Sequence, residues 1–202
     1  MDVYRIERST KLVLAHHIGN RDGEHTQRFL DKLKDAVTGR FQLTSDGFPA
    51  YQYNVPFTFR NDVAYGCLIK TYSSTQEQTR YSPATMVSAE KSIAYGSPDP
   101  DRIGTSIVER VNLTLRMSLR RFTRLTNGHS KSLRHHIAMQ NIFFATYNFV
   151  RKHSSIKMTP AMASGLTAKP WTTKELLEAA AEGQINVDNQ ASDVRPRKML
   201  HP

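Results

Sequence analysis

The stretch RDGEHTQRFLDKLKDAVTGRFQLTSDG, residues 21–47, decides the fold because it places a helix directly before a strand. Acids crowd the start of the helical part, Gly39 follows its end, and its apolar residues repeat at helical spacing, at Phe29, Leu30, Leu33 and Val37. Residues 40–47 then return to a strand, which stops at the turn signal Asp46-Gly47.

The segments on either side extend this pattern. Two strands are predicted before it, because residues 3–7 and 10–18 form apolar runs that RST can join by a turn. A short helix near Tyr51 and a strand in DVAYGCLIKTY, residues 62–72, follow it. Residues 73–104 lack clear periodicity, so we expect a long loop or an insertion there. Three helices are predicted after that, at about residues 105–124, 130–152 and 172–182, with a short helical turn at residues 158–166.

Strand, strand, helix, strand, strand and then helices predict an α/β sheet with packed helices. We expect one domain over residues 1–182, because neither side of the 73–104 segment alone has a convincing core. Residues 183–202 are polar and basic, and we expect them to form a disordered tail.

The chain is strongly basic, with a formal net charge of +10 over 202 residues. A folded domain with this charge indicates a polyanionic partner, with nucleic acid first and a membrane surface second. The alternative is a basic protein that binds no polyanion.

The single cysteine, Cys67, excludes a disulfide within the chain and a zinc site built from cysteines. It lies in an apolar stretch and is expected to be a small core residue in a reducing cytoplasm. No apolar run approaches the ~20 residues of a membrane span, and residues 1–19 lack the apolar region of a signal peptide. We therefore expect a cytoplasmic protein that does not cross a membrane.

Asp46 is the first candidate site residue. An aspartate that ends a strand and precedes glycine can reach into the crevice at the carboxyl edge of a sheet, where ligands bind. The alternative interpretation is that Asp46 is a simple Asp-Gly turn residue.

Glu109 is the second candidate, in the run TSIVERVNLTLRMSLRRFTR, residues 105–124. An acid in the first turn of a helix complements the helix dipole, and Thr105 or Ser106 can cap that turn, which explains Glu109 structurally. The helix carries more, however, because three polar residues are predicted to share the face of Glu109: Asn112, Arg116 and Arg120. Carboxylates that hold magnesium beside arginines that grip phosphate are suited to phosphoryl transfer.

Four stretches resemble bacterial insertion-sequence transposases of the DDE type, specifically the insertion-sequence-one-like group: TSDGFPAY at 44–51, TRYSPATM at 79–86, GSPDPDRIGTSIVERVNLTLRMSLRRFTRLTNGHSKS at 96–132 and YNFVRKHSSIKMTPAM at 147–162. The resemblance runs from about Thr10 to Trp171. It implies a ribonuclease-H-like fold, in which helices flank a mixed sheet. Three acids then bind two Mg²⁺ or Mn²⁺ ions and catalyse strand cleavage and strand transfer at the ends of the element. The implied partner is double-stranded DNA, the active form is a homo-oligomer, and the setting is the nucleoid of the bacterial cytoplasm.

Carried over by residue, the resemblance makes Asp46 the second acid and Glu109 the third, and it places Arg116 where the family often has a basic residue. The other expected DNA contacts are Asn112, Arg120, Arg121 and Arg124. The first acid should lie on an earlier strand, so this chain is expected to lack the first strand and to leave a sheet edge beside residues 3–18 unpaired. Asp2 and Glu7 are the only nearby acids, and both lie on the strand that matches the second strand of the family.

Three functions remain open from the sequence. The chain is a metal-dependent transposase, a remnant that binds DNA or a full-length transposase without cutting, or an inert product that folds poorly.

Overall fold

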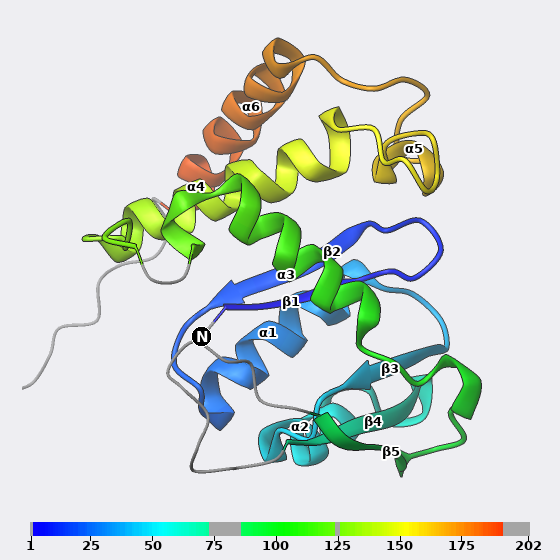
Figure 1. Ribbon diagram of the computed structural model, residues 1–202. Coiled ribbons are helices and arrows are strands. Elements are labelled where there is room, and N and C mark those ends of the chain that lie inside the picture. The colour runs from blue at the N-terminus through cyan, green and yellow to red at the C-terminus, as the bar shows by residue number, and fades with distance from the viewer. Residues whose placement is uncertain (1, 73–85, 124–125, 192–202) are drawn as a thin grey trace, which may run out of the picture. The chain divides into compact units, whose positions relative to one another are not determined.

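The computed structural model describes residues 2–72, 86–123 and 126–191 (Figure 1). The chain divides into two compact units, residues 1–131 and 132–202. The expected single domain over residues 1–182 therefore spans both units. Each unit is described by itself below.

The first unit begins with an antiparallel hairpin of β1 (Asp2–Ile6) and β2 (Val13–Ile18), in which Tyr4 lies opposite His16. The turn between these strands is organised by the Glu7 carboxylate. It accepts hydrogen bonds from the backbone N–H groups of Ser9 and Thr10, at 3.0 and 2.6 Å, and from both of their hydroxyls. Glu7 is thus a turn residue of the hairpin.

A mixed sheet follows, made of β3 (Phe41–Ser45), β4 (Val63–Tyr72) and β5 (Met86–Tyr95). Strand β3 pairs with β4 in parallel, and β5 pairs with β4 in the antiparallel direction. Helix α1 (Gly23–Ala36) leads into β3, and α2 (Pro49–Phe59) with the short 3₁₀ helix η1 (Arg60–Asp62) connects β3 to β4. The predicted α/β class, with helices flanking a mixed sheet, is confirmed.

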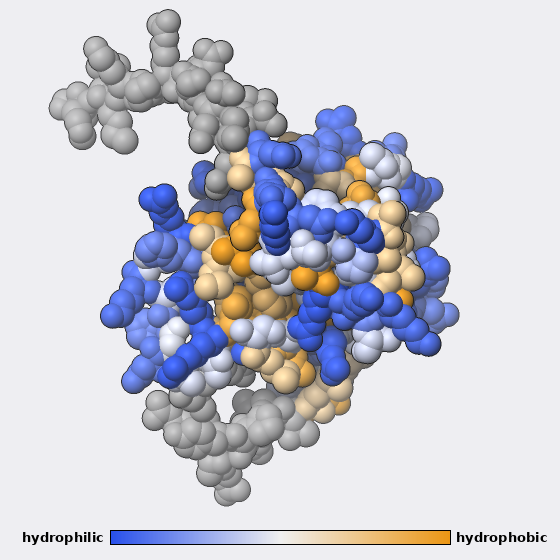
Figure 2. All heavy atoms as spheres, turned by 90° about the horizontal axis from the view of Figure 1, so that it is seen from above, coloured by the Kyte–Doolittle hydropathy of each residue, from blue (hydrophilic) through white to orange (hydrophobic). Residues whose placement is uncertain are grey.

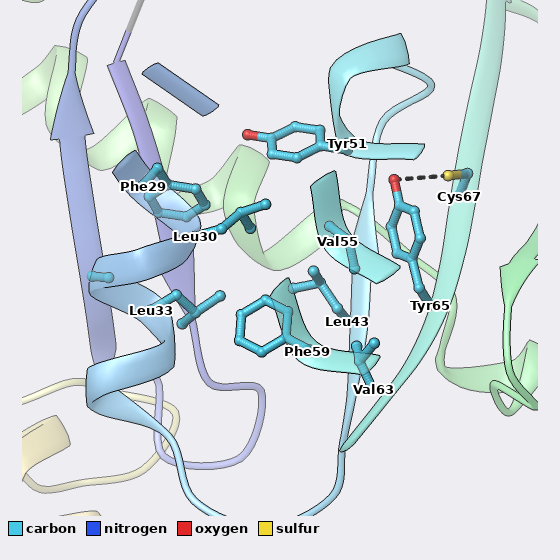
Figure 3. Packing of buried hydrophobic residues seen from close by; sticks show 11 residues of the cluster. Phe29, Leu30, Leu33, Leu43, Tyr51, Val55, Phe59, Val63, Tyr65 and Cys67 are labelled. Atoms are coloured by element: carbon cyan, nitrogen blue, oxygen red, sulfur yellow. Dashed lines mark hydrogen bonds between the residues drawn. The ribbon is translucent and has the colours of Figure 1, made fainter. Parts of the chain in front are cut away.

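One hydrophobic cluster joins both sheets to α1 and α2 (Figure 3). The periodic residues of α1 reach its centre, where Phe29, Leu30 and Leu33 are buried. Tyr65 and Cys67 of β4 also point into the cluster, and Cys67 is buried as expected. Burial of each large apolar side chain contributes roughly 1.5–3 kcal/mol, so this cluster is a main source of stability in the unit.

The hairpin and the mixed sheet are hydrogen-bonded separately, as sheets of order β1-β2 and β3-β4-β5. Among the described strands, β1 is paired on one edge only, by β2, and β3 on one edge only, by β4. The Arg5 side chain of β1 donates a hydrogen bond to the Gln42 carbonyl of β3 at 3.1 Å. Arg5 therefore satisfies a backbone acceptor on the edge of β3 that faces away from β4.

The structure corrects two predictions in this unit. For residues 73–104 we expected a long loop or an insertion, and the loop alternative is wrong for Met86–Tyr95, which forms β5, and for the 3₁₀ turn η2 (Pro100–Arg102). Residues 73–85 lie outside the described residues. The expected helix at 105–124 ends early. Helix α3 covers Ser106–Ser118, Leu119 is extended with φ −120° and ψ 110°, and the 3₁₀ turn η3 covers Arg120–Phe122.

The second unit is helical, with α4 (Leu133–Ala145), the π-helical turn η4 (Thr146–Val150), α5 (Pro160–Ala163) and α6 (Thr173–Ala191). Trp171 stacks on Phe149 with ring centroids 4.6 Å apart, and its backbone N–H donates to the Phe149 carbonyl at 3.0 Å. Helix α6 continues past residue 182 to Ala191, so this part of the predicted tail is helical, and residues 192–202 lie outside the described residues.

Several large apolar side chains of the second unit are exposed, among them Leu133, Leu166 and Leu177. Figure 2 shows apolar residues gathered between hydrophilic ones on the face seen from above. In the described part of the chain, every helix is too short or too polar to cross a membrane.

Candidate active site

A cavity of about 700 Å³ lies within the first unit. It is lined by β1, the end of β3, the second half of β4 and the first turns of α3. Asp46 and Glu109, which are far apart in the sequence, both line it, and so does Asp2. Three cationic side chains share the lining: Arg5, Arg21 and Lys70. The cavity therefore carries carboxylates and positively charged side chains together.

Asp46 directly follows the carboxyl end of β3. Its Oδ1 accepts a hydrogen bond from the backbone N–H of Phe48 at 3.3 Å, so it is a turn residue as well as a cavity residue. The preceding residue, Ser45, is fixed from β4, because the hydroxyls of Ser45 and Tyr65 lie 2.7 Å apart. Burial raises the pKa of the Tyr65 phenol, which keeps that phenol neutral and able to anchor the end of β3.

Glu109 lies in the first turn of α3. Thr105 is the N-cap residue, but its hydroxyl makes no capping bond to the backbone and donates instead to Glu109 Oε1 at 2.7 Å. Lys70 Nζ of β4 forms an ion pair with the same oxygen. The hydrogen bonds from Lys70 and Thr105 hold the pKa of the Glu109 carboxyl below its usual range, so Glu109 is ionised at neutral pH.

Helix α3 is fixed to β1 on both sides of Glu109, and Figure 1 shows the two elements side by side. The buried Tyr4 hydroxyl lies 2.9 Å from the Val108 carbonyl and 2.8 Å from Asn112 Oδ1. One phenolic proton serves one of these acceptors at a time. Asn112 lines the cavity, and its amide oxygen is one of the two acceptors of the Tyr4 hydroxyl.

The predicted arginine row is wrong beyond Arg116. Since α3 ends at Ser118, Arg120 belongs to η3 and does not continue the helical face of Glu109. Arg121, which was expected outside this row, also lies in η3. Arg121 Nη1 donates to the Ser130 hydroxyl at 3.3 Å. The residues that line the cavity do not include Arg116, Arg120 or Arg121, and Arg124 lies outside the described residues.

The cations that do line the cavity were missed by sequence reasoning. Arg5 is mostly desolvated, and burial lowers the pKa of its guanidinium, although an arginine remains charged. The Arg21 guanidinium lies over the Phe48 ring, 4.7 Å from its centroid. Lys70 follows the apolar part of β4. No local spacing relates these three residues to Asp46 or Glu109, so only the tertiary fold could have revealed them.

The two acids nearest to the expected first position, Asp2 and Glu7, differ in placement. Asp2 lines the cavity with Asp46 and Glu109. Glu7 holds the hairpin turn. Burial alone raises the pKa of the Glu7 carboxyl, but hydrogen bonds from Ser9 and Thr10 outweigh this effect and hold the pKa at about 2.

The donor set fits a hard divalent cation that is shared with substrate. Magnesium takes one or two protein carboxylates and completes its shell with water and phosphate oxygens. Asp46 and Glu109 supply such carboxylates to one cavity. Within the described residues, no three or more His, Cys, Asp or Glu side chains form a group that could hold a metal ion by themselves.

Comparisons with protein-family models, with curated proteins and with solved structures give no match for this chain. The function is therefore inferred from the site itself and from the sequence resemblance.

Proposed function

We propose that this chain is a DNA transposase of the DDE type with a ribonuclease-H-like sheet, which cleaves and transfers DNA strands at insertion-sequence ends in the bacterial cytoplasm. The observation that carries the proposal is that Asp46 and Glu109 line one cavity. The strongly basic composition supports a duplex DNA partner. The active form is proposed to be a homo-oligomer.

In this proposal Asp46 and Glu109 hold Mg²⁺ or Mn²⁺ at the scissile phosphate. A bound ion of this kind lowers the pKa of water and neutralises charge on phosphoryl oxygens. Glu109 is suited to this role because its carboxylate lines the cavity and is half exposed. Arg21 and Lys70 line the same cavity and supply positive charge for the phosphate.

The test is nicking of supercoiled plasmid DNA in Mg²⁺ or Mn²⁺. Asp46→Asn and Glu109→Gln should each slow nicking by more than about a hundredfold, since even residues that only orient metal ligands commonly cost 10–100-fold. The matched control is Asp35→Asn, which removes an exposed carboxylate of α1 outside the cavity and should leave the rate unchanged. Nicking that survives both cavity substitutions would refute the proposed ligands.

The second candidate is a remnant that binds DNA or a full-length transposase without cutting. Two observations favour it: Lys70 already pairs with Glu109, and the described residues contain no group of three or more His, Cys, Asp or Glu side chains that could hold a metal ion. This candidate predicts salt-sensitive binding to duplex DNA and no nicking with either metal.

A further inference from the structure

Lys70 is placed to act on Glu109 from a different element. Side chains alternate along a strand, so Lys70 of β4 points away from the face that carries Tyr65 and Cys67 into the core. The Lys70 side chain is 22% exposed and the Glu109 side chain is 53% exposed, so Lys70 is the more buried partner of the ion pair.

Two donors share one oxygen atom of the Glu109 carboxylate. Lys70 Nζ and the Thr105 hydroxyl both donate to Glu109 Oε1. Asp2 and Asp46 line the same cavity, so the ammonium group offsets part of the negative charge of that cavity. A divalent cation that binds Glu109 meets this ammonium group at close range, and like charges in a partly desolvated cavity oppose each other.

We propose that Lys70 is the resident counter-cation of this site. Its ammonium group neutralises Glu109 until a divalent metal ion takes its place, and Lys70 then turns to the phosphate of the bound DNA. The inference rests on the proposed function, because it takes Glu109 as a metal ligand. Lysine suits such an exchange because its ammonium is a compact charge on a flexible stem.

The affinity of the full chain for Mn²⁺ tests the proposed exchange of Lys70 for a metal ion. It is measured from the electron paramagnetic resonance signal of the free ion. Lys70→Met removes the competitor, so Mn²⁺ should bind about two- to fivefold more tightly, as expected from the strength of a solvent-accessible ion pair. Lys70→Arg keeps the competing charge and should stay close to wild type.

Arg21→Met is the matched control. It removes one positive charge from the same cavity, but Arg21 stacks on Phe48. Its effect on Mn²⁺ affinity should be less than twofold. Equal effects of Lys70→Met and Arg21→Met would show that only the general charge of the cavity matters, and would overturn the exchange.

Glu109→Gln separates this inference from the proposed function. If Glu109→Gln leaves Mn²⁺ affinity unchanged, Glu109 is no ligand, and both the proposed function and the inference fail. If Glu109→Gln abolishes Mn²⁺ binding but Lys70→Met does not alter it, the inference alone fails.

A measurement on the unmodified chain tests the exchange without relying on variants, which can misfold. In a Mg²⁺ titration followed by NMR, the side-chain Cε signal of Lys70 should shift with the same midpoint as the Glu109 carboxyl signal. A Lys70 signal that stays still while Glu109 responds would overturn the exchange.

Discussion

The Tyr4 hydroxyl shows how much of the site depends on single atoms. It connects β1 to the α3 backbone at Val108 and to the Asn112 amide, and these two residues flank Glu109. Tyr4 from β1 therefore holds the helix backbone beside Glu109, while Lys70 from β4 contacts its carboxylate. Neither residue stands near Glu109 in the sequence, so the order of the site comes from the packing of α3 against separate strands.

Tyr4→Phe should lower the free energy of unfolding by about 1–2 kcal/mol, because it leaves a partly buried acceptor without its donor. Urea denaturation followed by circular dichroism measures the change. Tyr53→Phe is the matched control, since Tyr53 is 76% exposed on α2, and it should change stability by less than about 0.5 kcal/mol. Equal stability of Tyr4→Phe and wild type would mean that packing alone holds α3.

The Glu7 carboxylate predicts an acid-dependent loss of stability. Its pKa is about 2 in the folded chain, against 4.5 as the ordinary value, so its stabilising effect is complete above about pH 4.5. The effect is lost as the pH falls from about 4.5 toward 2, because over this range the unfolded state takes up the proton while the folded state does not. The contribution should be about 1–2 kcal/mol after allowance for solvent screening.

Glu7→Gln tests this effect through urea denaturation at several pH values between 7 and 2. The variant should be less stable than wild type at pH 7, and the difference should shrink toward pH 2. A difference that stays constant over this range would show that Glu7 acts through packing and not through its charge.

At the scale of elements, the sequence predicts those segments whose periodicity is set by burial. The stripe of α1 is apolar because it faces the core, and Asp46 ends β3 because a turn must follow there. Strand β5 was not predicted, because its side chains are mostly exposed and leave no apolar pattern in the sequence. The strand forms through backbone pairing with β4. The end of α3 at Ser118 was not predicted either, because the amphipathic pattern of the sequence continues past Leu119, where the backbone becomes extended.

The unpaired edges of β1 and β3 predict a pattern of hydrogen exchange. The Gln42 carbonyl faces Arg5, so alternation places the backbone groups of Gln42 and Thr44 on the free edge of β3 and those of Leu43 toward β4. In exchange followed by NMR, the Thr44 amide should exchange about tenfold or more faster than the Leu43 amide. Equal protection of both amides would show that another segment or a second molecule covers this edge.

At the scale of the whole molecule, two groups of positively charged residues bear on the proposed function. One part lies inside the cavity, where Arg5, Arg21 and Lys70 accompany the three carboxylates. Another part lies outside it, where Arg116 and Arg120 are exposed at and beyond the end of α3. In the proposed function, the outer arginines hold the DNA backbone and the cavity residues act on a single phosphate.

The outer arginines therefore predict a loss of DNA binding that is separate from metal chemistry. Arg116→Ala combined with Arg120→Ala should weaken binding to duplex DNA and flatten the slope of log affinity against log salt by roughly one unit per lost phosphate contact. Fluorescence anisotropy across a salt series measures both quantities. Lys32→Ala combined with Lys34→Ala is the control, since it removes the same charge from exposed positions on α1. Glu109→Gln should keep or tighten DNA binding, because it removes a negative charge near the phosphate. If the lysine pair and the arginine pair flatten the slope equally, net charge alone determines binding and the arginines of α3 and η3 form no specific DNA surface.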